Sequence, residues 1–239
     1  MVLRVATGIK GFDELIEGGL PKSSLTLVSG NPGTCKSIFC LQTAYNVAIN
    51  TPVLYVSFEQ DEKDLLEQLN QLGLKTDKLK NLKIMRLEPE DPQVMTKILN
   101  TAKSIKAEFV IVDSLASLTS GPLNPSGQNY TASQILDSVI PVPLDAESLS
   151  RMKVKLILDT IKQTGATALL TSEIIKGQDG YSRDTLSEFL CDAIIVLHSV
   201  EGEDSYRTLN IPKMRLTKQK MGVYSFEVGK KGFVVKSSE

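Results

Sequence analysis

The feature that most constrains this chain is the stretch from Leu25 to Ser37, with the sequence LTLVSGNPGTCKS. It reads as a short apolar strand that runs into a loop containing glycine and proline, and a helical run follows at once. Where a strand, a tight loop and a helix N-terminus meet, backbone N–H groups converge and the helix dipole adds partial positive charge. Lys36 adds a full charge. The spacing is that of the phosphate-binding loop G-x-x-x-x-G-K-[ST], so the stretch predicts a nucleotide-phosphate site.

One position departs from this pattern, because Cys35 stands where a glycine is expected before the lysine. If the loop needs a positive φ there, a cysteine costs about 1–2 kcal/mol, which corresponds to a loss of about tenfold in ATP affinity. Two interpretations of Cys35 remain open. It is either a tolerated small residue or a redox gate, since a thiol at a helix N-terminus beside Lys36 is expected to have a lowered pKa.

The rest of the chain alternates apolar runs with amphipathic ones. Strands that are apolar on both faces and alternate with helices indicate a parallel sheet covered on both sides. The pattern predicts an α/β fold with a mostly parallel central sheet, flanked by helices, and a C-terminal antiparallel β extension. The expected strands cover residues 25–29, 52–57, 82–87, 109–114, 166–172, 193–198, 206–211, 223–228 and 232–235.

The expected helices include a short amphipathic one over Thr7–Ile16 and a longer one over Glu147–Thr164. In the longer helix the periodicity predicts that Leu149, Met152, Leu156 and Ile161 face the core. Residues 119–146 interrupt the alternation and predict a long loop. We expect a single domain over 1–239, in which this loop is an insertion and 205–239 form a C-terminal β segment.

Composition narrows the class of protein to which such a domain belongs. The 239 residues are 41% hydrophobic and 23% charged, with a net charge of −1, and they include three cysteines without paired spacing. These values are near those of an ordinary globular protein, and they argue against a disulfide framework or a zinc site. We find no signal-peptide layout and no apolar run long enough to span a bilayer. The expectation is a cytoplasmic protein without a membrane partner.

Polar residues follow four of the expected parallel strands, at the sheet edge where α/β proteins place their ligands. Asp113 has the form of a Walker-B aspartate, which holds Mg²⁺ through the water shell of the ion. Ser37 would ligate the same ion, and Lys36 would bridge the β- and γ-phosphates of ATP. Glu59 would orient the attacking water. The alternatives are that Asp113 merely ends a strand and that Glu59 only complements a helix dipole. The residues expected to contact the nucleotide are Asn31, Pro32, Gly33, Thr34, Cys35, Lys36, Ser37 and Ile38.

The order of these residues resembles that of the RecA superfamily of P-loop ATPases, in the branch of KaiC-like and archaeal RadA-paralogue ATPases. The resemblance covers essentially the whole chain except residues 119–146. Its residues are Thr7-Gly8-Ile9, Phe12-Asp13, Gly18-Gly19-Leu20-Pro21, Gly30 to Ser37, Phe58-Glu59, Val112-Asp113-Ser114, Thr171-Ser172-Glu173 and Lys213-Met214-Arg215.

This resemblance implies a single KaiC-type, RecA-like core that binds ATP and assembles head-to-tail, often as a hexamer, with nucleotide at the subunit interfaces. It implies that Glu59 is the catalytic carboxylate and that Ser172 and Glu173 sense the γ-phosphate. It also implies that Lys213 and Arg215 reach the γ-phosphate bound by the neighbouring subunit, in the manner of an arginine finger.

Three departures bear on turnover: Cys35, Gln60 where a second acid often follows Glu59, and Gln219 where a histidine often stands. They favour a slow Mg²⁺-dependent ATPase, acting as a homo-oligomer in DNA recombination or repair or in regulatory signalling. One alternative is a recombinase paralogue that binds single-stranded DNA through loops 119–146 and 174–188. The other is a non-hydrolysing nucleotide sensor or scaffold with a protein partner. The loops would offer DNA only Lys176, Arg183, Tyr130 and Tyr181.

Overall fold

A computed structural model describes residues 2–77, 79–120, 146–175, 177, 180–200 and 205–236. Its centre is a nine-stranded sheet in the order β11-β10-β9-β8-β3-β7-β6-β4-β5. The predicted α/β fold, with a mostly parallel sheet and antiparallel C-terminal strands, is confirmed. Six strands are parallel: β3 (Leu25–Gly30), β4 (Val53–Ser57), β5 (Leu82–Arg86), β6 (Phe109–Asp113), β7 (Thr167–Glu173) and β8 (Ala193–Val200). The antiparallel strands are β9 (Tyr206–Met214), β10 (Val223–Gly229) and β11 (Gly232–Val235), and β1 (Arg4–Val5) pairs separately with β2 (Leu20–Pro21).

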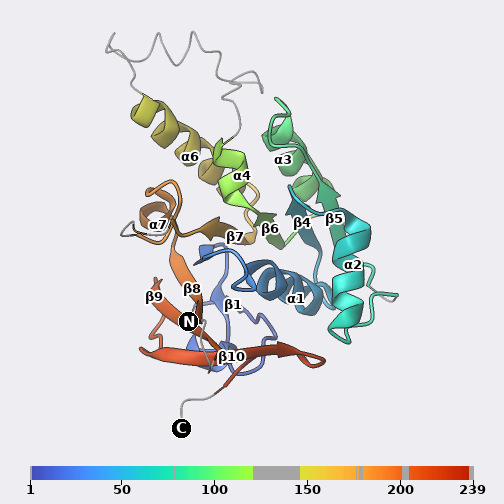
Figure 1. The fold of residues 1–239 in the computed structure, drawn as a ribbon. Helices are drawn as coiled ribbons and strands as arrows, with labels where there is room; N and C mark the ends of the chain where they lie inside the picture. Colours follow the sequence, from blue (N-terminus) through green and yellow to red (C-terminus); the bar gives the residue numbers. More distant parts are fainter. Residues whose placement is uncertain are drawn as a thin grey trace.

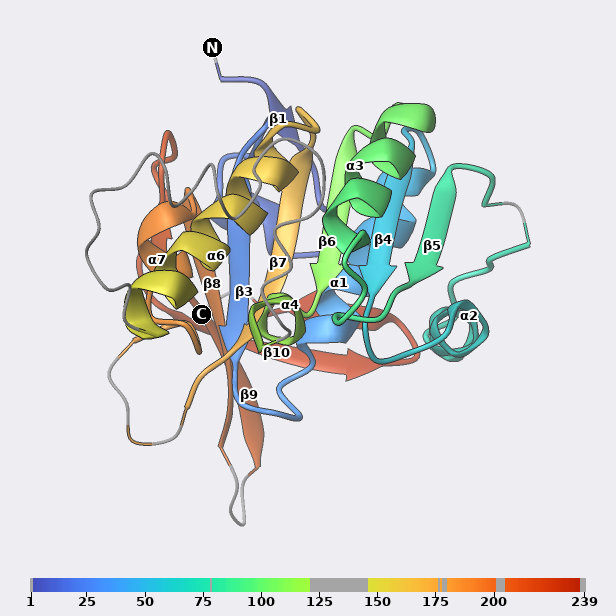
Figure 2. The same cartoon turned by 90° about the horizontal axis from the view of Figure 1, so that it is seen from above.

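Helices cover both faces of the sheet (Figures 1 and 2), which explains why the strands are apolar throughout. One buried cluster joins the sheet to α1 (Lys36–Ala48) and α2 (Glu62–Gln71). A second cluster joins the opposite face to α3 (Val94–Ser104), α4 (Leu115–Ser120) and α6 (Ala146–Lys162). A short helix, α7 (Ser187–Leu190), precedes β8. Figure 2 shows the arrowheads of β4, β5 and β6 pointing to the same edge, beside the start of α1.

Four aromatic rings fix α1 between the two ends of the chain. Phe39 on α1 lies 5.1 Å from Phe12 and 5.3 Å from Phe233 between ring centroids, and Phe233 stacks on Phe226 at 4.3 Å. The side chain of Gln42 accepts a hydrogen bond from the Phe233 backbone N–H at 2.6 Å and donates one to its carbonyl at 3.2 Å. The hairpin of β10 and β11 is therefore packed on the helix that follows the phosphate-binding loop.

The predicted helix over Thr7–Ile16 is wrong, because the segment contains only a 3₁₀ turn at Asp13–Leu15. Gly8 and Gly11 adopt φ values of 67° and 79°, which a helix does not allow. The Asp13 carboxylate accepts hydrogen bonds from the N–H groups of Thr7 and Gly8, at 3.0 and 2.9 Å, and so holds the chain in a compact loop.

The predicted inward face of α6 is only partly correct. Ile161 is buried as expected, but Met152 and Leu156 are 36% and 43% exposed. The buried stripe instead comprises Val154, Ile157, Leu158 and Ile161. Apolar residues occupy two stripes of this helix, and only the second packs into the buried cluster on this face of the sheet.

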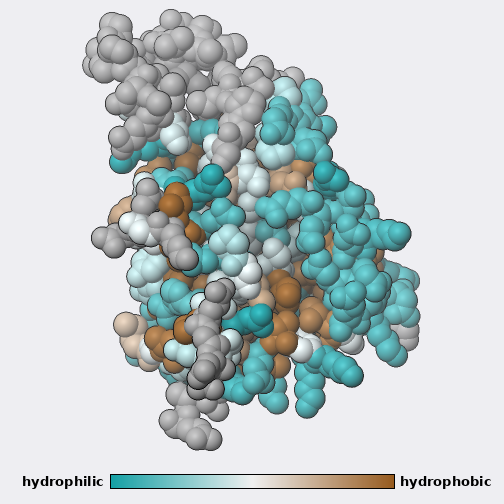
Figure 3. All heavy atoms as spheres, viewed as in Figure 1, coloured by the Kyte–Doolittle hydropathy of each residue, from teal (hydrophilic) through white to brown (hydrophobic). Residues whose placement is uncertain are grey.

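The two ends of the predicted loop over 119–146 are wrong, because Thr119 and Ser120 belong to α4 and Ala146 is the first residue of α6. Residues 121–145, and the side chain of Leu149, lie outside the described part of the structure. Within the described residues no helix is both long enough and apolar enough to cross a membrane. Figure 3 shows a mainly hydrophilic surface over α2 and more apolar residues over α7.

Candidate active site

The loop between β3 and α1 has the geometry of a phosphate cradle. Gly30 has φ of 152°, and a Cβ atom there would lie 2.3 Å from the Leu197 carbonyl oxygen, so only glycine fits. Thr34 closes the loop by donating its hydroxyl to the Asn31 carbonyl at 2.8 Å. The ammonium of Lys36 donates to the Gly30 and Asn31 carbonyls at 2.9 and 3.0 Å, so its charge lies over the loop.

Cys35 immediately precedes α1 and adopts φ 69° and ψ 27°, the left-handed region. The backbone therefore has the conformation for which glycine is favoured, and the cysteine is strained. Burial raises the pKa of the Cys35 thiol, and the nearby charges of Arg207 and Lys36 lower it by less. The prediction of a lowered pKa, on which the redox-gate hypothesis depended, is wrong.

Three carboxylates act electrostatically on the Lys36 ammonium. They are those of Glu59, Asp113 and Glu173, which follow or end β4, β6 and β7. Strand register explains the arrangement, since Ser57 pairs with Asp113 and Gly30 pairs with Glu173. Burial lowers the pKa of Lys36, and the charges of Glu173, Asp113 and Glu59 oppose that shift. The structure thus brings together the strand-end residues that the sequence singled out.

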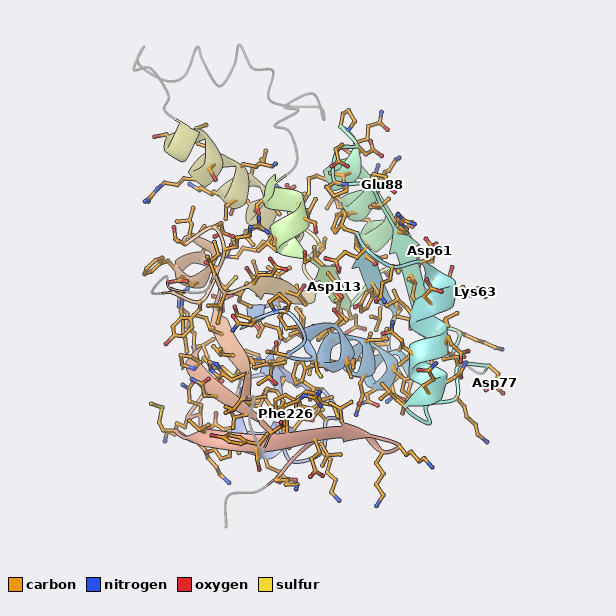
Figure 4. All side chains as sticks on the ribbon, viewed as in Figure 1. Asp61, Lys63, Asp77, Glu88, Asp113 and Phe226 are labelled. Carbon is orange, nitrogen blue, oxygen red and sulfur yellow. The ribbon has the colours of Figure 1, made fainter. Side chains whose placement is uncertain are left out.

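Asp113 is held rigidly at the end of β6, near the centre of the molecule (Figure 4). Its two oxygens accept hydrogen bonds from the Tyr55 hydroxyl at 2.7 Å and from the Thr171 hydroxyl at 2.6 Å. The sequence reading missed both partners, although a hydroxyl inside an otherwise apolar strand is a usable signal. Two donated hydrogen bonds fix the carboxylate and leave lone pairs for a water or a metal ion.

Hard oxygen donors suit a magnesium ion at this place. Asp113 and Ser37, the latter in the first turn of α1, offer a carboxylate and a hydroxyl. Among the described residues no group of three or more His, Cys, Asp or Glu side chains could hold a metal by itself. Mg²⁺ typically binds one or two protein oxygens together with substrate phosphates and water, so this donor set fits it.

Glu59 lies two residues beyond β4, just before α2. The Ser57 hydroxyl accepts the N–H groups of Glu59 and Gln60, at 3.4 and 2.9 Å, and this fixes the turn. Partial burial raises the pKa of Glu59, and the charges of Asp113 and Glu173 raise it further. A raised pKa brings a carboxylate closer to the range in which a general base is effective.

The segment Tyr181–Arg183 lies against the carboxyl ends of β3 and β7. The Ser29 hydroxyl donates to the Tyr181 carbonyl, and the Ser172 hydroxyl accepts the Arg183 N–H at 3.3 Å. The Arg183 guanidinium donates to Glu173 at 3.1 Å. Both predicted sensor residues, Ser172 and Glu173, are therefore bonded to this segment. Sequence reasoning did not assign Arg183 to the site.

Arg215 lies toward the opposite edge of the sheet from the loop of its own subunit, whereas Lys213 is level with Leu27 in the middle of β3. The Arg215 N–H bonds to the Asp192 carbonyl, and the Asp192 N–H bonds to the Leu25 carbonyl. Arg215 is thus level with the start of β3, whereas Gly30 is at its end. Five residues of strand separate the two levels by about 16 Å.

Both cations have partners within the subunit. The Lys213 ammonium donates to the carbonyls of Glu188, Phe189 and Cys191 at 2.9, 3.2 and 2.6 Å, around the end of α7. The Arg215 guanidinium, which is 56% exposed, donates to Asp192 at 3.2 Å. In the head-to-tail assembly that the sequence predicts, these groups would face another subunit.

A groove of about 1000 Å³ runs along α1 toward the C-terminal hairpin. It combines an apolar base with amide and cationic groups, including Gln42, Asn46, Tyr206, Arg207, Phe226 and Lys230. The charge of Arg207, which lines this groove, acts on the Cys35 thiol of the phosphate loop. Two of the residues considered for DNA binding, Tyr130 and Lys176, lie outside the described part of the chain.

The KaiC family of ATPases, in the profile described as "ATPase: KaiC", matches residues 5–239. The circadian clock oscillator protein KaiC of Synechococcus elongatus is 31% identical over 233 residues, which are 95% of this chain and 43% of KaiC. The chain thus spans less than half the length of KaiC.

Two archaeal relatives match over nearly their whole length. The UPF0273 protein MJ1359 of Methanocaldococcus jannaschii is 30% identical over 244 residues, covering 97% of this chain and 96% of that protein. The crystal structure of a KaiC-like protein from Pyrococcus horikoshii superposes with a TM-score of 0.79 at 30% identity, over 99% of this chain and 100% of that one. The loop geometry, the sheet and these matches together show that the chain belongs to the KaiC-like family of RecA-superfamily P-loop ATPases.

Proposed function

We propose that this chain is a slow, Mg²⁺-dependent ATPase that acts as a homo-oligomer. The observation that supports this most directly is the position of the Lys36 ammonium over the phosphate loop, where the charges of Glu59, Asp113 and Glu173 act on it. Lys36 and the loop N–H groups bind the triphosphate. The groove beside Arg207 accommodates the rest of the nucleotide.

Mg²⁺ fits the donors at the loop, where Ser37 would ligate it and Asp113 would hold it through water. The ion supplies neutralisation of charge on the β- and γ-phosphates. The hydrogen bonds from Tyr55 and Thr171 keep Asp113 in one orientation, so that its water-mediated contacts are fixed in advance. Lys36 adds a second positive charge from the protein itself.

Glu59 is the residue that activates water. A water oxygen forms a bond to the γ-phosphorus while the bond from that phosphorus to the β,γ-bridging oxygen breaks, and the electron pair stays on the ADP. The proton lost by the water goes first to the Glu59 carboxylate and then to solvent. The products are ADP, inorganic phosphate and one proton. A carboxylate with a raised pKa accepts that proton more readily.

Turnover and binding measured together test this proposal. E59Q should keep ATP affinity and lose turnover by a factor on the order of 10²–10⁴, the range for general-base catalysis. K36A should lose ATP affinity itself. K22A, which removes an exposed lysine paired with Glu108, is the control and should behave as the unmodified chain. Unchanged turnover in E59Q would exclude the role proposed for Glu59.

Lys213 and Arg215 act on the nucleotide of a neighbouring subunit, and a hexameric ring is one assembly that permits this. The distance of Arg215 from the phosphate loop of its own subunit supports a role in trans. A mixture of K36A and R215A subunits should recover part of the turnover that each lacks alone, because some interfaces then combine two intact halves. Mass photometry with and without Mg-ATP reports the assembly. No recovery, in mixtures that do assemble, would argue against a shared site.

A second candidate is a nucleotide sensor that binds ATP without hydrolysing it. It is favoured by Gln60 and Gln219, and the Gln219 side chain donates to the Ile211 carbonyl of its own subunit at 2.7 Å. Tight Mg-ATP binding without phosphate release, together with a nucleotide-dependent protein partner, would favour the sensor. A role with single-stranded DNA is tested separately by salt-dependent binding of a labelled oligonucleotide.

A further inference from the structure

Arg183 is built into the edge of the candidate site. Three hydrogen bonds anchor its segment, from Ser29 to the Tyr181 carbonyl and from Arg183 to Ser172 and Glu173. Glu173 is the register partner of Gly30, the residue that opens the phosphate loop. The guanidinium of Arg183 is therefore one contact away from the loop and its Lys36.

The negative charges at the site outnumber the positive charge of Lys36, which favours a second cation there. Glu59, Asp113 and Glu173 present three carboxylates to one ammonium, that of Lys36. A triphosphate adds further negative charge at the same point. Arg183 is the other cation that the described residues of this subunit direct to these carboxylates, through its bond to Glu173.

The ion pair between Arg183 and Glu173 is suited to an exchange in which Arg183 leaves Glu173 for another anion. The two side chains are 50% and 38% exposed. Ion pairs at such exposure contribute little to stability, because solvent screens them. A phosphate accepts the same two-pronged hydrogen bonds from a guanidinium as a carboxylate does, and it has more charge.

We propose that Arg183 leaves Glu173 to bind the γ-phosphate of ATP in its own subunit and acts there as an arginine finger in cis. Glu173 is its resting partner, and the bond between Ser172 and the Arg183 N–H keeps the segment at the sheet edge during the exchange. The proposal rests on the proposed ATPase function. Under this proposal each nucleotide is contacted by Arg183 of the subunit that binds it, in addition to the Lys213 and Arg215 expected from the neighbouring subunit.

The chemistry of the step follows from charge. As the bond between the γ-phosphorus and the β,γ-bridging oxygen breaks, negative charge spreads over the oxygens of the transferred group. A guanidinium that contacts them stabilises that transition state, and fingers of this kind raise turnover by about 10³–10⁵-fold. The same contact is absent from ADP, so Arg183 should favour ATP over ADP in binding.

The test compares R183A, R183K and a matched control, R86A. Arg86 is an arginine of similar exposure, paired with Asp61 and Glu88 on the far strand β5. Binding of ATP and ADP is measured by isothermal titration, and turnover by phosphate release. R183A should lose turnover at least 100-fold and reduce the preference for ATP over ADP about tenfold, with ADP affinity unchanged. R183K should recover part of both, and R86A neither.

The outcomes separate this proposal from the ATPase function on which it rests. If the unmodified chain releases phosphate and R183A matches R86A, the role of Arg183 is wrong and the ATPase stands. If the chain binds ATP without turnover, the ATP-over-ADP preference alone decides for or against Arg183. If neither nucleotide binds, both proposals fall. In an E173Q background the effect of R183A should persist, and its disappearance would mean that Arg183 acts only through Glu173. A melting temperature within about 4 °C of the unmodified chain excludes misfolding.

Discussion

Replacing Cys35 by glycine should stabilise the protein, because Cys35 has φ 69° in the loop before α1. A side chain in the left-handed region costs about 1–2 kcal/mol. Glycine removes that strain, but its greater freedom in the unfolded chain offsets about 0.4–1 kcal/mol. The appropriate reference is C35A, which keeps a Cβ and removes only the sulfur. The difference between the two variants should be about 0.8 kcal/mol in favour of glycine.

In a domain of this size such a difference raises the melting temperature by about 2 °C, which scanning calorimetry of C35G and C35A resolves. The size of this strain also limits how much the substitution can change ATP affinity, since about 1.4 kcal/mol corresponds to a tenfold change in affinity. C35G should therefore bind ATP no more than about tenfold more tightly than C35A, as measured with a fluorescent ATP analogue. Equal melting temperatures for the two variants would refute the claim that residue 35 is strained.

Three further predictions concern pH, thiol chemistry and packing. Turnover should fall at acidic pH as Glu59 becomes protonated, and because the pKa of Glu59 is raised, this fall should begin at a higher pH than for an ordinary glutamate. The pH–rate profile of E59Q should lack this acidic limb. Because burial raises the pKa of Cys35, its alkylation at neutral pH should be slow and should accelerate with rising pH, while Cys40, fully buried, stays unlabelled; rapid labelling at pH 7 would contradict this. On α6, I157A should cost about 2–5 kcal/mol in urea unfolding and L156A far less, and equal costs would show that the buried face is wrongly assigned.

Much of the fold was predictable because its signals are local. Apolar runs that end at Ser29, Asp113 and Ser172 predict parallel strands, and parallel strands bring their carboxyl ends to one edge. That rule alone places Glu59 and Asp113 beside Lys36. The roles of these residues in catalysis remain predictions, which the variants above test.

The features that sequence did not predict depend on packing and register. Two apolar stripes compete on α6, and only contact with the sheet decides between Leu156 and Ile157. The segment around Asp13 has a helical apolar pattern, yet the carboxylate bonds to nearby N–H groups and glycines turn the backbone away from a helix. Arg183 is ten residues from Glu173 in sequence, and nothing in the spacing indicates that they form an ion pair.

The ring contacts between Phe39, Phe233 and Phe226 bear on where the nucleotide-binding unit ends. Residues 205–239 read in sequence as an extension of the core, but in three dimensions the final hairpin is one wall of the packing around α1. A chain shortened before Gly232 would leave Phe39 without one of its two ring partners and Gln42 without both of its hydrogen bonds to Phe233. Truncation there should lower stability and loosen the helix that follows the phosphate loop, so we expect a fragment without the hairpin to bind ATP weakly.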